Sequence, residues 1–320
     1  MSILVVGSVG LDDVQTPMGC RRRVLGGACT YFAAAASLYT QVRIVAVVGT
    51  DFPQDHIDLF VSRQIDLRGL QVVEGETFFW SGLYRDDLDA CETLDTRLNV
   101  FADFHPTIPD ELRDSEYLFL ANIDPELQLE VLDQMHHPRL TALDSMNFWI
   151  TSKKAALIEA LSRVDVVLLN ESEIKLLTQQ PNWIAAAEAI LGLGPRALIV
   201  KRGAHGAALV TRGESVGDRF FMVPAYPLDY VVDPTGAGDT FAAGFMGYLA
   251  KTGDLSLGAM RRAVVQGTVV ASFTVQDFSI DRLRTLTLEE IHVRYQTLRR
   301  LTYFEPATED EFPGFDRALI

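Results

Sequence analysis

The stretch from Val231 to Phe241 reads VVDPTGAGDTF and combines a flexible turn with a carboxylate. We expect an apolar strand end over 231–233, then a tight turn, then a helix that opens with Asp239. Gly236 and Gly238 carry no Cβ, so an anion can approach the backbone, and the free N–H groups of a helix start attract it. A carboxylate placed there would repel that anion, which predicts a base acting on a second substrate beside a bound phosphate. The simpler alternative is a tight turn with Asp239 as a partner of the helix dipole.

A second set of polar residues, Asn170, Glu171 and Glu173, follows the buried strand expected over 164–169. In open α/β sheets, ligands bind at the carboxyl ends of the strands, so an amide and two acids at this place indicate a binding site. An N-cap role for Asn170 is the alternative, and the two roles are compatible.

Buried apolar runs alternate with helical stretches along most of the chain, which predicts an α/β fold with a parallel sheet. Gly26-Gly27 opens an alanine-rich helix, and paired glycines at a helix start again allow close approach to the backbone. The stretch 197–210 reads as a hairpin with a glycine-containing turn. Its Lys201 is a suitable point charge for phosphate, although a hairpin lysine is usually solvated. The strands are expected at 3–6, 42–49, 117–122, 140–144 and 164–169.

Between these units lies a short, aromatic, β-rich region. Its two expected strands, 77–84 and 98–104, flank the acidic stretch 86–89. Two hairpin strands bury little by themselves, so they are expected to cover a substrate cleft, a partner subunit, or both. An ordinary edge of the main sheet is the alternative.

The bulk composition indicates a soluble, cytoplasmic protein. The chain has 320 residues, a formal charge of −15 and a pI near 4.8, which argues against nucleic-acid and anionic-membrane partners. Its three cysteines are scattered, its six histidines show no metal-ligand spacing, and no signal peptide precedes the first strand. We expect one domain over 1–320, with a poorly ordered acidic tail at 305–320.

The DPTGAGDTF string at 233–241, with the Asn170–Glu173 NxxE element, resembles the ribokinase-like (PfkB) carbohydrate kinase family. The resemblance extends over roughly residues 3–280. It implies a three-layer α/β/α sandwich with a mostly parallel central sheet and a small β lid, contributed by about 11–25 and 71–105. It also implies ATP-dependent transfer of the γ-phosphate to a hydroxyl of a sugar or sugar-like molecule.

The family pattern implies roles for individual residues. Gly236, Ala237 and Gly238 would form an anion hole beside the general base Asp239. Glu173 would hold Mg²⁺ through water, in keeping with the reluctance of Mg²⁺ to lose its hydration shell. Asp233 would lie near a monovalent cation such as K⁺. The residues implied to bind ATP are Asn170, Glu173, Lys201, Gly203, Gly206 and Thr235.

On the acceptor side, the resemblance implies contacts from Asp12, Gly26 and Gly27. A carboxylate such as Asp12 can accept hydrogen bonds from two sugar hydroxyls at once. Tyr31 occupies the position where the family usually has an asparagine, and an aromatic ring would suit a stacked ring or base as well as a pentose. This departure leaves the identity of the acceptor open.

Three other readings remain open. A nucleoside kinase of the same family is favoured by Tyr31 and the aromatic lid. A sensor that binds a sugar or nucleotide without catalysis would keep the fold, but it would have no use for Asp239. A structural oligomer built through the lid strands predicts self-association, and a homodimer through the lid is also compatible with a kinase.

Overall fold

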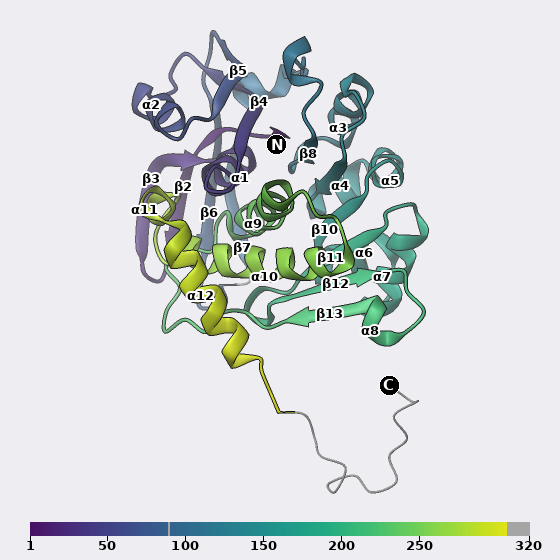
Figure 1. Cartoon of the computed structure of the whole chain (residues 1–320). Coiled ribbons are helices and arrows are strands. Elements are labelled where there is room, and N and C mark those ends of the chain that lie inside the picture. The colour runs from purple at the N-terminus through teal and green to yellow at the C-terminus, as the bar shows by residue number, and fades with distance from the viewer. Residues whose placement is uncertain (89, 306–320) are drawn as a thin grey trace, which may run out of the picture.

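The computed structural model describes residues 1–88 and 90–305, so the predicted tail at 306–320 and Asp89 lie outside the described residues. Within the described part, nine strands form one central sheet (Figure 1). Seven of these strands, β1, β4, β5, β8, β9, β10 and β11, are parallel, whereas β12 and β13 add to one edge as antiparallel strands. In sheet order the strands are β13 (Phe220–Val223), β12 (Ala207–Thr211), β11 (Ala197–Lys201), β10 (Val166–Asn170), β9 (Leu140–Asp144), β8 (Tyr117–Leu120), β1 (Ser2–Val6), β4 (Gln41–Gly49) and β5 (Asp66–Val73).

Helices cover both faces of this sheet and bury two apolar cores. Successive residues of β1 point to opposite faces, so Ile3 and Val5 belong to one core and Leu4 and Val6 to the other. The three-layer α/β/α prediction is therefore confirmed. The first face carries α1 (Ala28–Ala36), α9 (Ala237–Thr252), α10 (Leu257–Thr274) and α12 (Leu288–Leu301), and the second carries α3 (Pro125–Gln134), α5 (Lys154–Ser162), α6 (Glu171–Thr178) and α7 (Trp183–Gly192).

Shorter helices join these layers, and none of the described helices is long and apolar enough to span a membrane. The short α-helices are α2 (Gln54–Ser62), α4 (Asn147–Ser152), α8 (Val216–Arg219) and α11 (Asp281–Thr285), and the 3-10 turns are η1 (Asn99–Asp103), η2 (Asp110–Leu112) and η3 (Gly203–His205).

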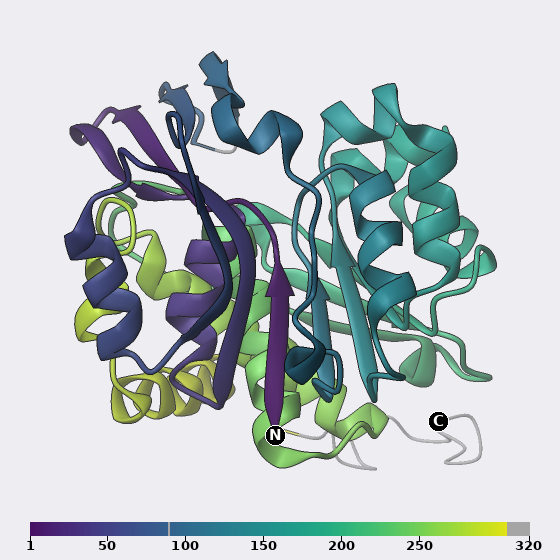
Figure 2. The same cartoon turned by 90° about the horizontal axis from the view of Figure 1, so that it is seen from above.

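A separate four-stranded sheet forms the lid at the end of the molecule toward which β1 runs (Figure 2). Its order is β3 (Gly19–Gly26), β2 (Gly10–Thr16), β6 (Phe78–Tyr84) and β7 (Cys91–Arg97). The lid therefore combines two segments that are far apart in the sequence, close to the ranges expected.

The strand expected at 98–104 is wrong. The hairpin partner of β6 is β7, and residues 99–103 form the 3-10 turn η1. The composition of β7 is polar because nearly all of it is exposed, so it lacks the apolar signal of a strand. Phe101 and Phe104 are spaced for a helical turn instead, and their rings stack with centroids 5.6 Å apart.

The strand end expected at 231–233 is also wrong, since β13 ends at Val223 and the chain is irregular up to α9. The amides of Val232 and Asp233 donate to the Val275 carbonyl rather than to a sheet partner. Helix α9 begins at Ala237, two residues before Asp239, which lies in its first turn. The carboxylate therefore lies within the helix start.

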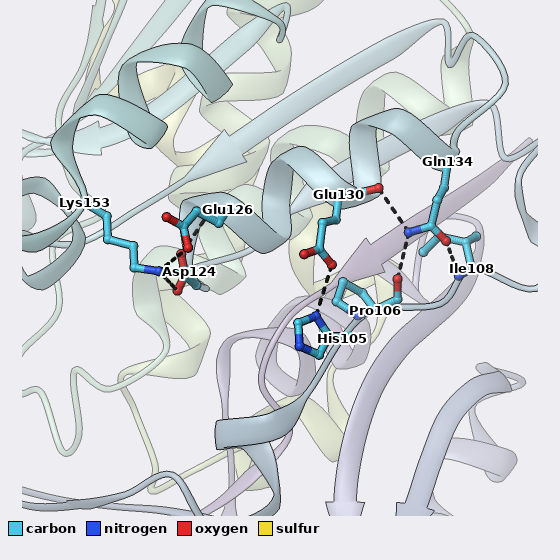
Figure 3. Close-up of polar contacts among 8 residues, drawn as sticks. All are labelled: His105, Pro106, Ile108, Asp124, Glu126, Glu130, Gln134 and Lys153. Atoms are coloured by element: carbon cyan, nitrogen blue, oxygen red, sulfur yellow. Dashed lines mark hydrogen bonds and ion pairs between the residues drawn. The ribbon is translucent and has the colours of Figure 1, made fainter.

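The segment that leads from the lid back to the central sheet is fastened along α3 (Figure 3). Gln134 accepts a hydrogen bond from the Ile108 amide at 2.9 Å and donates to the Pro106 carbonyl at 2.8 Å. At the other end of α3, Asp124 caps the helix and Lys153 pairs with Asp124 and Glu126. These contacts fix where the chain enters β8.

Candidate active site

The carboxyl ends of the central strands bring the predicted nucleotide residues together. Asn170 on β10 lies opposite Lys201 on β11 in the parallel register. The Lys201 ammonium donates to Asp144, at the end of β9, over 2.6 Å, and both side chains are largely buried. Asp144 was given no role from the sequence, although its place at a strand end follows the same rule that identified Asn170.

The glycine turn lies against this cluster. Gly236 is the N-cap of α9 and has φ 75°, a conformation that favours glycine. A Cβ on Gly238 would lie 3.2 Å from the Lys201 Nζ atom, so the lysine charge is next to the helix start. The start of α9 and the Lys201 ammonium are thus neighbours, and a helix start beside a cation suits an anion. The Ala237 amide of this turn donates to the Pro234 carbonyl over 3.2 Å.

Asp239, in the first turn of α9, has an unusual electrostatic environment. Burial and the nearby Asp144 raise the pKa of its carboxyl to about 7, against the opposing effect of Lys201. A carboxylate with a pKa near neutrality is a far better proton acceptor than an ordinary aspartate. The site thus supplies the base strength that the residue type alone lacks.

Asn170 and Glu173 form a reciprocal capping box at the start of α6. The Asn170 side chain accepts from the Glu173 amide at 2.8 Å, and Glu173 accepts from the Asn170 amide at 2.7 Å. Burial raises the pKa of Glu173 to about 7, even though Lys201 favours its charged form. The capping alternative is correct for Asn170, and one Glu173 oxygen is left for another ligand.

Lys201 itself is a buried charge. Burial alone would lower its pKa, but the carboxylates of Asp144 and Glu173 raise it, so the ammonium form is favoured. The alternative of a solvated hairpin lysine is therefore wrong. The turn that follows carries Gly203 and Gly206, both at positive φ, and it lies at the same sheet edge as Asn170.

On the acceptor side, Asp12 leans over Gly26 and next to Gly27. A Cβ on Gly26 would come within 1.9 Å of the Asp12 carboxylate, and the Gly27 amide donates to that carboxylate. Burial, together with Asp233 and Asp239, raises the pKa of Asp12 to about 8. Hydrogen-bond donors from a substrate would stabilise its charged form.

The aromatic ring of Tyr31 is not available to stack on a ligand, contrary to expectation. The residue is 1% exposed, and a Cβ on Gly236 would come within 2.2 Å of the ring, which therefore supports the glycine turn from below. Its hydroxyl is buried without a hydrogen-bond partner among the described residues. Burial and the neighbouring Asp12 raise its pKa, so it stays a neutral phenol.

Asp233 and Thr235 connect the turn to its surroundings. The Asp233 carboxylate accepts from the amides of Thr235 and Ser279, and burial raises its pKa. The Thr235 hydroxyl donates to the hydroxyl of Tyr84 on lid strand β6 over 3.3 Å. Tyr84 therefore links the lid to the glycine turn, a contact that its sequence position did not reveal.

Comparison with known proteins identifies the family of the chain. The model for the pfkB family of carbohydrate kinases matches residues 4–282. The chain belongs to this family. It is 31% identical to a cytidine kinase of Thermococcus kodakarensis over 251 residues, which is 77% of this chain and 87% of that protein. It is also 26% identical to a nucleoside kinase of Methanocaldococcus jannaschii over 167 residues, about half of each chain.

Solved structures share the fold at lower identity. A Burkholderia thailandensis nucleoside kinase in complex with inosine superposes with a TM-score of 0.77 at 20% identity and covers 95% of this chain and all of that one. Arabidopsis thaliana ribokinase, complexed with ribose and ATP, gives a TM-score of 0.73 at 20% identity, covering 92% and 98%. The chain is thus a member of a family that uses ATP, and it is a sugar or nucleoside kinase.

Proposed function

We propose that this kinase transfers the γ-phosphate of ATP to a hydroxyl of a nucleoside, with Asp239 as the general base. The observation that carries the base assignment is its raised pKa in the first turn of α9, beside Lys201 and the glycine turn. The nucleoside acceptor is supported by the 31% identity to a cytidine kinase across most of both chains.

In the proposed mechanism, Asp239 takes the proton of the acceptor hydroxyl while its oxygen bonds to the γ-phosphorus. The bond from that phosphorus to the bridging oxygen breaks, and ADP leaves. The amides of Gly236, Ala237 and Gly238 stabilise the developing negative charge, with Lys201 beside them. Most of the acceleration comes from this positioning and charge stabilisation.

ATP would lie along the strand ends, with Asn170, Lys201, Gly203, Gly206 and Thr235 around its phosphates. Mg²⁺, when bound, neutralises phosphate charge. The donors fit this ion, because Mg²⁺ needs few carboxylates besides phosphates and water, and the Glu173 carboxylate lies at the start of α6 beside Asn170. Glu173 would hold it through water, since one of its oxygens is engaged by the Asn170 amide.

Asp12, Gly26 and Gly27 would hold the sugar hydroxyls of the acceptor. The surroundings of Asp12 favour this role, because a buried carboxylate with one backbone donor has room for hydroxyl donors, which would stabilise its charged form. Tyr31 would act by supporting the glycine turn, and its unpartnered hydroxyl would bond to the acceptor or to Asp12 after closure.

Three further proposals concern the context of the enzyme. A K⁺ ion near Asp233 would neutralise that buried carboxylate, and activity in K⁺ against an organic cation tests it. A homodimer through the exposed lid edge β7 is tested by light scattering. A cytoplasmic location agrees with three free cysteines among the described residues.

The decisive experiment measures ADP release from Mg-ATP with cytidine, other nucleosides, ribose and sugar phosphates, for wild type and Asp239→Asn. We expect turnover of a nucleoside that falls at least a thousandfold in the variant while ATP binding persists. Turnover of ribose alone would replace the nucleoside with a sugar. Ligand binding without turnover would support a sensor, and full activity of the variant would refute the base assignment.

A further inference from the structure

The lid sheet has two faces, and the strand register shows which side chains share the face of Asp12. Gly10 pairs with Phe78 and Asp12 pairs with Trp80, in parallel register and without a bulge. Paired residues in a sheet point to the same side. A Cβ on Gly10 would contact the Phe78 ring at 2.5 Å, which agrees with this assignment. Trp80 is therefore the direct neighbour of Asp12.

Other lid contacts separate the two faces in the same way. Phe79, between Phe78 and Trp80, pairs with Arg97, whose guanidinium lies 4.6 Å from the Phe79 ring centre on the opposite face. Tyr84 reaches Thr235 of the glycine turn, so its side chain points toward the body of the protein. Tyr84 is four positions after Trp80 on the same strand, so the two side chains share a face. The face of Trp80 and Asp12 is thus the one turned to the candidate active site.

The indole of Trp80 is held flat along this face. A Cβ on Gly82 would come within 2.1 Å of the indole Cη2 atom, so the ring lies over the glycine backbone. Its Nε1 donates to the Thr93 hydroxyl on β7 over 3.3 Å. The side chain remains partly exposed. A fixed, partly exposed aromatic face is what a planar ligand group needs for stacking.

We propose that Trp80 is the platform on which the base of the acceptor nucleoside stacks, while Asp12 beside it holds the ribose hydroxyls. This inference rests on the proposed nucleoside acceptor. Every base offers a π-face, so a stacking contact favours nucleosides over free sugars without selecting strongly among bases. The site would therefore accept several nucleosides.

The test compares Trp80→Leu and Trp80→Phe with wild type, using cytidine and ribose as acceptors. We expect Trp80→Leu to raise the KM for cytidine by about ten- to a hundredfold, because stacking is lost. The KM values for ribose and ATP should change less than about twofold, since neither would use the indole. Trp80→Phe, which keeps a ring, should restore most of the affinity. Phe79→Leu, on the opposite face and buried beneath the Arg97 guanidinium, is the control and should leave all three KM values unchanged.

Tryptophan fluorescence gives a readout that does not depend on turnover. The chain has three tryptophans, and we expect cytidine to quench the emission in wild type and in Phe79→Leu but not in Trp80→Phe. An unchanged KM for cytidine in Trp80→Leu overturns this inference and leaves the nucleoside kinase intact. Turnover of ribose without any nucleoside overturns the nucleoside acceptor, and the stacking role with it. A wild type that neither binds nor phosphorylates any acceptor refutes the proposed function itself.

Discussion

In the mechanism that we propose, Asp239 acts as a base and so needs its negative charge, in a place that disfavours charge. Burial and Asp144 raise its pKa to about 7. Because the proposed roles need both Asp239 and Asp12 charged, we expect log kcat/KM to rise with a slope of two below about pH 7 and with a slope of one up to about pH 8, the pKa of Asp12, and then to level. A pH profile at low acceptor concentration measures this. A flat profile from pH 5 to 8 would exclude Asp239 as the base.

The same raised pKa values make a prediction about stability. Folded Asp239 and Asp12 bind protons more tightly than the unfolded chain, whose aspartates titrate near pH 4. Their stabilising effect is therefore complete below about pH 4 and is lost as the pH rises through 7 and 8. We expect Asp239→Asn to raise the Tm at pH 8 and to leave it unchanged at pH 4. A variant that is less stable at pH 8 would show that the charged carboxylate stabilises the fold.

Lys201 and Asp144 form a buried pair whose partners depend on each other. Removing one partner strands the other charge, so Lys201→Met should lower the free energy of unfolding by about 3 kcal/mol. The double variant Lys201→Met/Asp144→Asn should recover most of that stability, because no unpaired charge remains. Both should lose about a hundredfold in kcat if Lys201 stabilises the transferred phosphate. Denaturant melts and steady-state kinetics on the three proteins separate the two roles.

At the scale of elements, the positions of candidate residues at strand ends were predictable from the sequence, and contacts that depend on packing were not. Asn170, Lys201 and Asp239 follow recognisable strand-turn or turn-helix patterns. The burial of Tyr31 depends on α9, which contacts α1 across about 200 residues of sequence. The pairing of Lys201 with Asp144 depends on the order of the strands in the sheet, which local sequence patterns do not reveal.

The two misassigned strands have local causes. Strand β7 is exposed on both faces of the lid edge, so its sequence carries no alternating apolar signal. Val231 and Val232 are apolar, yet the amides of Val232 and Asp233 donate to the carbonyl of Val275 in the chain after α10. Such a short apolar run fits either environment, and only the tertiary structure decides between them.

The contacts along α3 support a prediction about one connecting segment. Gln134 satisfies the Ile108 amide and the Pro106 carbonyl, so Gln134→Ala leaves both without their partner. We expect a loss of about 2 kcal/mol in the free energy of unfolding. Glu130→Ala is the matched control, because its pair with His105 is exposed and contributes less than about 1 kcal/mol. Equal losses of stability in both variants would contradict the stabilising role of the two Gln134 hydrogen bonds.

At the scale of the whole molecule, the lid is a separate sheet, and the hydrogen bond between Tyr84 and Thr235 joins it to the glycine turn. A closed lid excludes water from the transferred phosphate. Loss of this bond should favour the open lid by about 1 kcal/mol, since that is the usual net value of one hydrogen bond. More open molecules would let water compete with the acceptor.

We therefore expect Tyr84→Phe to raise the ratio of ATP hydrolysis to phosphate transfer by about fivefold, with a smaller change in the KM for ATP. The measurement compares ADP release with the phosphorylated acceptor formed, in the presence of saturating acceptor. Tyr303→Phe, an exposed tyrosine just after α12, serves as the control and should behave as wild type. An unchanged ratio in Tyr84→Phe would contradict this role of the hydrogen bond to Thr235. Contacts with the bound acceptor would then be what keeps the lid closed.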